Sequence, residues 1–397
     1  MKCLMLALPG LFDRPDADKN IKTPLESAST PETDRLAERS SVGLVRTVPM
    51  HFRLPENAGA LSLLGLSPEK LPDMRASFEL YGSGMTMKKD DAVLFCGFVS
   101  LSEAETYERR IMLCSHPGLN CSQLRQLTDA LNRELGSSVF EFRLAENGSM
   151  FLLWHRGEPS PGTFHLPAAA EGREIAEYLP SGDFTPVLTD LMKSSAVMLA
   201  GHTVNAELKS GSKHTADSIW LWGAGAKPRL PAFEDIFGVR AAAVSTDRYF
   251  SGIAKLSGLK TVVCAGEVSE EALARRADRA AAFAERYGLV YLYDDSLTKC
   301  TDYTERREAI ELIDRQLIGR LVKKLRSCGG PFRLLFTADN AYPLSLGCPT
   351  LEAVPYLLFD SRRTKKHPAV FNESIPVQRF IPDGSSLVSL LLEHSGA

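Results

Sequence analysis

The chain has 397 residues, of which 44% are hydrophobic and 24% charged, and its formal net charge is -3. This length predicts two or three domains or one large core with an insertion, and the composition is that of a globular rather than a disordered protein. The nearly neutral charge argues against a general nucleic-acid or anionic-membrane binder, and no segment approaches the roughly 18 uninterrupted apolar residues of a membrane span.

The N-terminal segment is predicted to begin with a strand over residues 2–8. That strand runs into Pro9-Gly10 without a small-residue cleavage site, so we interpret it as part of the fold rather than a signal peptide and expect a cytoplasmic protein. Pro24 and Pro31 each follow a threonine and indicate two helix starts. A second apolar strand is predicted over residues 93–99.

The middle of the chain changes in character. An amphipathic helix over 122–135, strand-like runs over 139–144 and 150–154, and a Pro/Gly-rich stretch over 158–167 suggest a small α+β insertion. We therefore predict a core domain formed by residues 1–102 and 196–397, with an inserted cap domain at 103–195.

The last third alternates strands with helices. The predicted strands cover 261–265, 289–293 and 332–337, and the predicted helices cover 269–288 and 304–327. This alternation predicts βαβ units and an α/β core with a mainly parallel central sheet flanked by helices. Ligands bind such sheets beyond the carboxyl ends of the strands, where Asp295 and Asp339 lie. Aspartates also end strands simply as turn formers.

Several common catalytic motifs are absent from the sequence. Gly223-Ala224-Gly225-Ala226-Lys227-Pro228 lacks the Gly-Lys-Ser/Thr ending of a phosphate-binding loop, and neither Gly-x-Ser-x-Gly nor His-Glu-x-x-His occurs. The eight cysteines form no Cys-x-x-Cys pair, and the eight histidines are isolated from one another. The basic runs 362–366 and 323–324 are interpreted as solvated loop and helix faces.

A set of phrases spread over nearly the whole chain resembles the archaeal-type, cofactor-independent phosphoglycerate mutases of the alkaline phosphatase superfamily. The phrases, in chain order, are Thr23-Pro24-Leu25-Glu26-Ser27-Ala28, Asp34-Arg35-Leu36-Ala37, Leu61-Ser62-Leu63-Leu64-Gly65, His202-Thr203-Val204-Asn205, Ile219-Trp220-Leu221-Trp222-Gly223, Gly252-Ile253-Ala254 and Val354-Pro355-Tyr356. The resemblance implies an alkaline-phosphatase-like core with an inserted cap.

Members of that family interconvert 3- and 2-phosphoglycerate with two divalent metals and a serine that carries the phosphoryl group. The resemblance implies that Asp295 and Asp339 are residual metal-ligand positions and that Arg240, Asn205 and Arg75 are substrate-binding positions. It places Glu56 at the nucleophile position. The residues implied at lost ligand positions are Pro9, Lys299, Asn340 and Pro349.

These substitutions lead us to expect a protein inactive by the family's metal and phosphoserine mechanism, with no metal cofactor and a binding or regulatory role. The expected partners are a small phosphorylated ligand or an unidentified protein, and neither nucleic acid nor membrane. One alternative is an enzyme with altered chemistry in the same cleft, with Glu56 as nucleophile or metal ligand; another is an active phosphoglycerate mutase. Glu56 could also mimic the charge of a phosphoserine and pair with Arg240, or be an exposed acid at a helix start.

Overall fold

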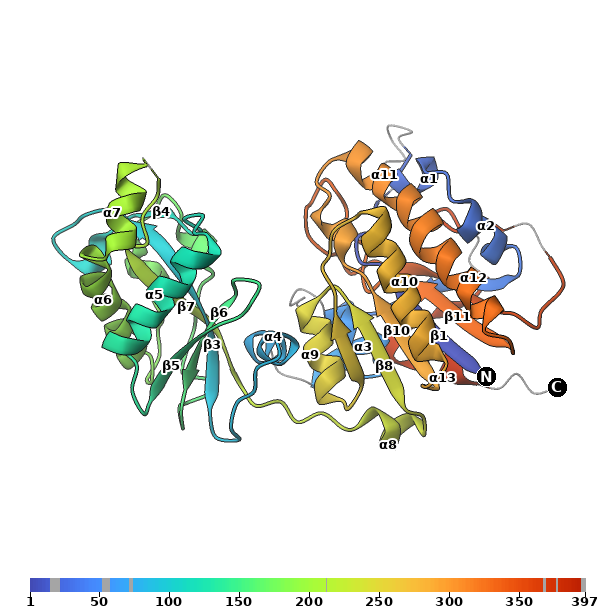
Figure 1. The fold of residues 1–397 in the computed structure, drawn as a ribbon, viewed down its shortest axis with the longest axis horizontal. Helices are drawn as coiled ribbons and strands as arrows, with labels where there is room; N and C mark the ends of the chain where they lie inside the picture. Colours follow the sequence, from blue (N-terminus) through green and yellow to red (C-terminus); the bar gives the residue numbers. More distant parts are fainter. Residues whose placement is uncertain are drawn as a thin grey trace. The chain divides into compact units, whose positions relative to one another are not determined.

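The computed structural model describes residues 1–14, 22–51, 58–70, 74–211, 213–366, 369–375 and 378–393. The chain forms two compact units, one from residues 1–72 and 230–397 and the other from residues 73–229 (Figure 1). Each unit has its own sheet.

The first unit is built on an eight-stranded sheet in the order β13-β2-β12-β11-β1-β10-β8-β9. Strands β9, β8, β10, β1 and β11 run parallel, and β12 is antiparallel to both β11 and β2. The strands are β1 Lys2–Ala7, β2 Ser40–Val45, β8 Ala241–Ser245, β9 Lys260–Val263, β10 Leu289–Tyr293, β11 Phe332–Thr337, β12 Val354–Asp360 and β13 Phe380–Ile381. The prediction of an α/β core with a mainly parallel sheet is confirmed.

The central strands are mostly apolar and are covered by helices. All residues of β10 and β11 are buried, which is the pattern of parallel strands with both faces covered. Helices α9, α10 and α13 contact the sheet, as Figure 1 shows for the first two. The helices of this unit are α1 Pro24–Ser27, α2 Pro31–Ala37, α3 Ala58–Leu63, α8 Phe233–Phe237, α9 Arg248–Leu256, α10 Glu270–Ala284, α11 Tyr303–Ile313, α12 Arg320–Ser327 and α13 Leu387–Leu392.

The long helix predicted over 304–327 contains a π-helical segment, Asp314–Gly319, between α11 and α12. Asp314 is buried there, and its carboxylate accepts hydrogen bonds from the backbone N–H groups of Glu32 and Thr33 at 2.9 and 2.8 Å. Those N–H groups belong to the first turn of α2, which lacks a side-chain cap of its own. The π-helical segment thus supplies the cap of a helix some 280 residues earlier.

The second unit contains a five-stranded antiparallel sheet in which β3 pairs with β4, β6 and β7, and β6 with β5. Its strands are β3 Ala92–Leu101, β4 Met112–Cys114, β5 Phe140–Leu144, β6 Met150–Trp154 and β7 Ser218–Ala226. Its helices are α4 Arg75–Gly82, α5 Cys121–Glu134, α6 Pro186–Ala200 and α7 Thr203–Ser210.

The second unit extends beyond the predicted insertion of 103–195 at both ends. The reason is strand pairing: β3 and β7 hydrogen-bond to each other along most of their length, and β3 also pairs with β6. Local sequence does not reveal these long-range pairs. The glycine-rich phrase from Gly223 lies in β7, so it forms no phosphate-binding loop. Among the described residues, no helix is long and apolar enough to cross a membrane.

Candidate functional site

Three adjacent strands of the first unit bring predicted site positions to one edge of the sheet. The strands β11, β1 and β10 are neighbours and run parallel, so their carboxyl ends meet. Pro9 follows β1, Asp295 follows β10 and Asp339 follows β11. The residues after the strands are tied together, since Asp294 N–H donates to Ala7 O at 2.9 Å and Leu8 N–H to Thr337 O at 3.0 Å.

The Asp295 carboxylate is held by two neighbours. Its Oδ1 accepts a hydrogen bond from Thr246 Oγ1 and lies 3.6 Å from Lys299 Nζ. Thr246 follows β8, and Lys299 ends a 3-10 turn that begins at Ser296. An ammonium therefore lies beside this carboxylate and opposes the binding of a cation there.

Asp339 is buried and hydrogen-bonded. Its Oδ2 accepts the Tyr293 hydroxyl at 2.8 Å, and only 3% of the residue is exposed. Burial, and to a lesser degree the nearby Asp295 charge, raise the pKa of Asp339 to about 6, although the hydrogen bond from Tyr293 opposes this shift. Burial also raises the pKa of Tyr293, with Asp339 as the next cause, so the phenol remains a hydrogen-bond donor.

The residues after Asp339 complete the edge. Asn340 donates from Nδ2 to Thr350 O at 3.1 Å, and its buried Oδ1 has no partner among the described residues. This bond places Pro349, which precedes Thr350, at the same edge. Helix α3 begins against these residues, because a Cβ on Gly59 would lie 2.2 Å from Asp339 O and 2.7 Å from Asn340 Oδ1.

Pro9-Gly10 packs closely on the turn that carries Lys299. Gly10 has φ +86°, and a Cβ there would lie 2.7 Å from the backbone C of Leu297 and N of Thr298. Glycine is therefore required by both the left-handed conformation and the close approach. Pro9 is buried and offers no side-chain donor to this edge.

A buried ion pair supports the same edge from α10. Arg276 contacts Asp294 through Nη1, and their side chains are 1% and 0% exposed. Arg276 also donates to the carbonyls of Ala272 and Glu267, and Asp294 accepts Ser296 N–H at 3.1 Å. The neutralised Asp294 is thus a structural neighbour of Asp295.

A second acidic group lies where the chain leaves β1. Glu373 accepts hydrogen bonds from Asp13 N–H and Thr23 Oγ1, both at 2.9 Å. Burial raises its pKa to about 7 against the opposing effect of those hydrogen bonds. Asp13 lies 3.8 Å from the buried Arg306, whose guanidinium also donates to two carbonyls.

The other predicted positions do not join this cluster. Glu56 lies outside the described residues. Arg240 precedes β8 and is exposed at the amino end of that strand, so the register places it at the opposite edge of the sheet from Asp295.

Asn205 is buried in α7 of the second unit, where its amide bonds to the backbone of Leu199 and Ala216. Arg75 pairs with Glu79 in α4 at 2.9 Å. The Asn205 amide is therefore already hydrogen-bonded to backbone groups, and its substrate-binding role stays a prediction from the resemblance.

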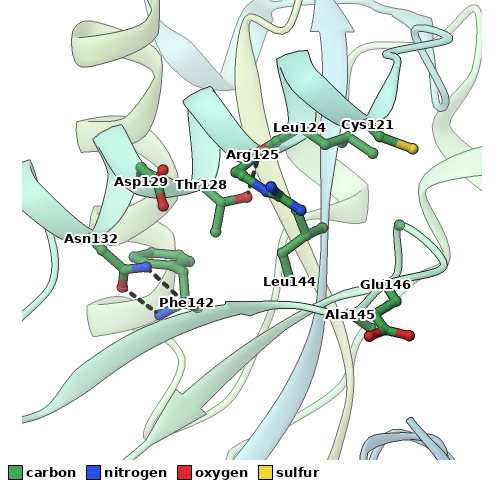
Figure 2. Close-up of a pocket in the computed structure, with 11 residues that line it drawn as sticks. Cys121, Leu124, Arg125, Thr128, Asp129, Asn132, Phe142, Leu144, Ala145 and Glu146 are labelled. Atoms are coloured by element: carbon green, nitrogen blue, oxygen red, sulfur yellow. Dashed lines mark hydrogen bonds between the residues drawn. The ribbon is translucent and has the colours of Figure 1, made fainter.

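A separate pocket of about 290 Å³ lies between α5 and the β5–β6 hairpin of the second unit (Figure 2). There the Asn132 amide accepts a hydrogen bond from Phe142 N–H at 2.8 Å and donates one to Phe142 C=O at 2.7 Å. These two bonds occupy that part of the outer edge of β5. Arg125, Asp129 and Glu146 also line the pocket, so its charges are mixed. This mixture indicates no particular ligand.

The divalent metals that the resemblance implies do not fit the described side chains of the first unit. Within the described ranges, no group of three or more His, Cys, Asp or Glu side chains is arranged to hold a metal. Asp295 and Asp339 are each engaged by protein hydrogen bonds, and the Lys299 ammonium opposes a cation beside Asp295. We therefore assign no step to a metal.

Comparison with known proteins finds homologues that cover nearly the whole chain. The model of 2,3-bisphosphoglycerate-independent phosphoglycerate mutase matches residues 37–205. A probable mutase of this kind from Geobacter sulfurreducens is 28% identical over 404 residues, covering 99% of this chain and 100% of the relative. A second from Methanothermobacter thermautotrophicus is 29% identical, covering 90% and 88%. The chain is a full-length homologue of the archaeal-type mutases.

Solved structures show that the fold is shared with this homologous group. A Pyrococcus horikoshii protein matches all of this chain and 99% of its own at a TM-score of 0.74 and 22% identity. The cofactor-independent phosphoglycerate mutase from Thermoplasma acidophilum matches both chains in full at a TM-score of 0.63 and 19% identity. The predicted α/β fold class is therefore confirmed.

Several residues of the cluster were missed from the sequence. Tyr293 ends a predicted strand but reads as an ordinary buried aromatic residue, and Thr246 follows a strand that the alternation did not predict. Glu373 and Asp13 lie far apart in the chain and meet only through the fold. The one local signal in the sequence is the position of a polar residue directly after a strand, and this signal singles out Asp295 and Asp339.

Proposed function

We propose that this mutase homologue is a divergent enzyme that acts on a small phosphorylated acid at the carboxyl edge of its eight-stranded sheet. The observation that carries the proposal is that Pro9, Asp295 and Asp339, which follow three adjacent strands, meet at one edge of a chain homologous to the mutases over its full length. Parallel sheets bind their ligands at this edge.

The residues at that edge suggest distinct roles. Lys299 supplies a positive charge that can pair with a phosphate or carboxylate of the substrate, since its side chain is 58% exposed. Asp339 and Tyr293 share a hydrogen bond in a buried setting, which suits a group that holds a proton beside the bound substrate. Glu56 keeps the proposed role of carboxylate nucleophile, which comes from the resemblance alone.

A binding or regulatory role without turnover is the second candidate. It is favoured by the charges at the edge, because the Lys299 ammonium lies beside the Asp295 carboxylate and the Pro9 side chain has no carboxylate. Such a protein would retain the mutase scaffold and recognise a phosphorylated acid, with no metal cofactor. The same experiment distinguishes the two candidates.

The test follows 3-phosphoglycerate by ³¹P NMR with purified full-length protein, in parallel with Mn²⁺ and with a chelator. The divergent-enzyme proposal expects formation of 2-phosphoglycerate or inorganic phosphate. It also expects at least a hundredfold loss in Asp339→Asn and in Glu56→Ala, because each change removes a group that the reaction uses. The matched control is Asp190→Asn, an exposed aspartate of the second unit, which should retain the wild-type rate.

Calorimetric titration with 3-phosphoglycerate then separates the remaining outcomes. Binding without any phosphorus conversion, weakened by Lys299→Ala, would reject the enzyme and support the binding protein. Failure of the wild-type chain both to convert and to bind the compound would reject both candidates.

A further inference from the structure

A pocket lined by arginines lies at the other edge of the eight-stranded sheet. It has a volume of about 400 Å³ and is lined by Arg39, Arg326, Arg362, Phe359 and Ser361 together with residues 330–332. Phe332 begins β11, whereas Asp339 follows the end of that strand. At about 3.3 Å per residue, the pocket lies roughly 20 Å from the acidic cluster.

The three guanidiniums come from separate parts of the chain. Arg39 follows α2, Arg326 lies in the last turn of α12, and Arg362 follows β12. From the sequence, the basic runs 323–324 and 362–366 are interpreted as solvated faces. The first run lies next to this pocket, and the second contributes Arg362 to its lining. Convergence of like charges from three elements is unfavourable unless an anion or a local acid offsets it.

The local acid does not offset the charge. Asp360 accepts a bidentate pair of hydrogen bonds from Arg362, at 3.0 and 2.6 Å, and also lies 3.8 Å from Arg333 Nε. The single Asp360 carboxylate therefore lies beside two guanidinium groups, those of Arg362 and Arg333. Arg39 and Arg326 have no ion pair within the described part of the chain, so the pocket carries an excess of positive charge.

The end of α12 would ordinarily repel an anion, because unpaired carbonyls at a helix C-terminus carry partial negative charge. Here Lys2 Nζ donates to the carbonyls of Cys328 and Gly329 at 3.1 and 3.0 Å. A fourth cation therefore covers those oxygens. The backbone at this corner does not cancel the charge of Arg326.

Two other pockets of the protein have a smaller excess of positive charge. A pocket of about 500 Å³ beside α10 also contains arginines, but Arg275 is paired with Glu267 and Glu271, and Arg276 with Asp294. The pocket of Figure 2 mixes one arginine with two acids. The pocket beside α10 also contains Arg279, which has no ion pair among the described residues, but Asp278 in the same lining pairs with Arg320 and Lys324. At the amino edge of β11, the excess of cations over acids among the described lining residues and their recorded partners is larger than in either of these two pockets.

We propose that Arg39, Arg326 and Arg362 form a binding site for a small soluble molecule that carries a phosphate or diphosphate group. Guanidinium groups bind phosphate oxygens in a bidentate manner, which explains why three arginines rather than lysines face the pocket. A volume of about 400 Å³ is at the small end of ligand pockets, so it suits a compact phosphorylated metabolite rather than a polymer.

Calorimetric titration of the full-length protein with inorganic pyrophosphate tests this site. Wild-type protein should bind the probe, and the affinity should fall as NaCl is raised, because the guanidiniums are near the surface. Arg39→Ala and Arg326→Ala should each weaken binding at least fivefold, and the double variant at least twentyfold. Arg326→Lys should fall between wild type and Arg326→Ala because it keeps the charge but loses the bidentate geometry.

The matched control is Lys323→Ala, which removes an exposed cation from the same helix outside the pocket and should bind pyrophosphate as the wild type does. Circular dichroism of each variant checks that it is folded. Equal affinity of wild type and the double variant would overturn the proposal, as would failure of the wild type to bind millimolar pyrophosphate. Arginine-dependent binding to phosphatidic acid vesicles without binding of soluble pyrophosphate would also overturn it.

Discussion

The two edges of the eight-stranded sheet differ in charge and in how their charges are satisfied. At the carboxyl edge, Asp294, Asp295 and Asp339 each have a hydrogen-bond donor or cation from the protein itself. At the amino edge, Arg39 and Arg326 have no ion pair in the described chain. Charges that are already paired within the protein are less available to a ligand than unpaired surface charges.

This contrast changes the view of the mutase scaffold. At the edge where the sequence resemblance predicts the site, the carboxylates already have partners within the protein, so a ligand there must displace or share existing contacts. The edge without a role in the homology carries the available charge. Fold and family therefore indicate where to look, but the charges at each edge decide what can bind there.

The largest expected effect concerns the buried Arg276–Asp294 pair. Arg276→Met should lower the free energy of unfolding by about 3–5 kcal/mol, because it leaves a fully buried carboxylate without its counter-ion. Urea denaturation followed by circular dichroism measures the change. Addition of Asp294→Asn should recover a large part of the loss. A single variant within 1 kcal/mol of wild type would contradict a structural role for this carboxyl-edge pair.

The next effect is a pH dependence from Glu373. Its folded pKa of about 7 lies above the ordinary value of 4.5, so the folded protein holds a proton that the unfolded chain releases between those pH values. This group therefore contributes most stability below about pH 4.5, and the contribution falls by up to about 3 kcal/mol as pH rises to 7.

Glu373→Gln should flatten that part of the stability profile, measured by urea unfolding at pH 5 and pH 8. Glu271→Gln, at an 88% exposed side chain, is the control and should leave the profile unchanged. An unaltered slope in Glu373→Gln would show that burial does not hold the proton. No such slope is expected from the arginines of the amino edge, because they stay charged throughout this range.

A smaller effect is expected at Lys299. Lys299→His should bind Mn²⁺ about tenfold more tightly than the wild type, because it replaces a cation beside Asp295 by a neutral metal-binding ring. Calorimetric titration at pH 8 measures the affinity, with Lys324→His as a control away from the edge. Equal affinities would mean that Lys299 does not limit cation binding there.

The smallest effect should be that of Arg326→Ala on stability. The side chain is exposed and has no ion pair in the described chain, so the free energy of unfolding should change by less than about 0.5 kcal/mol. Thermal and urea unfolding check this. A loss above 1 kcal/mol would assign the arginine to the fold and weaken the contrast between the edges.

The sequence predicts the local elements well and the long-range ones poorly. Strands at 289–293 and 332–337 match β10 and β11 because fully buried parallel strands are continuous apolar runs. Asp295 and Asp339 are singled out because they follow these two predicted strands. The π-helical segment at Asp314 and the β3–β7 pairing depend on partners far away in the chain, and no local pattern encodes them.

The arginine pocket shows the same division. The run at 362–366 is visible in the sequence, but its proximity to Arg39 and Arg326 arises only when α2, α12 and β12 pack together. Isolated basic runs are usually solvated, so the interpretation of each run alone was reasonable. Charge excess is a property of the assembled surface.

The central place of β1 has a consequence for biosynthesis. This apolar strand is made before its hydrogen-bonding neighbours β10 and β11, which begin only at residues 289 and 332. During synthesis, Lys2–Ala7 therefore lacks its native partner strands until residues 289–337 have been made. Truncated products that end before β10 should therefore be prone to aggregation, because β1 then lacks both of its neighbouring strands.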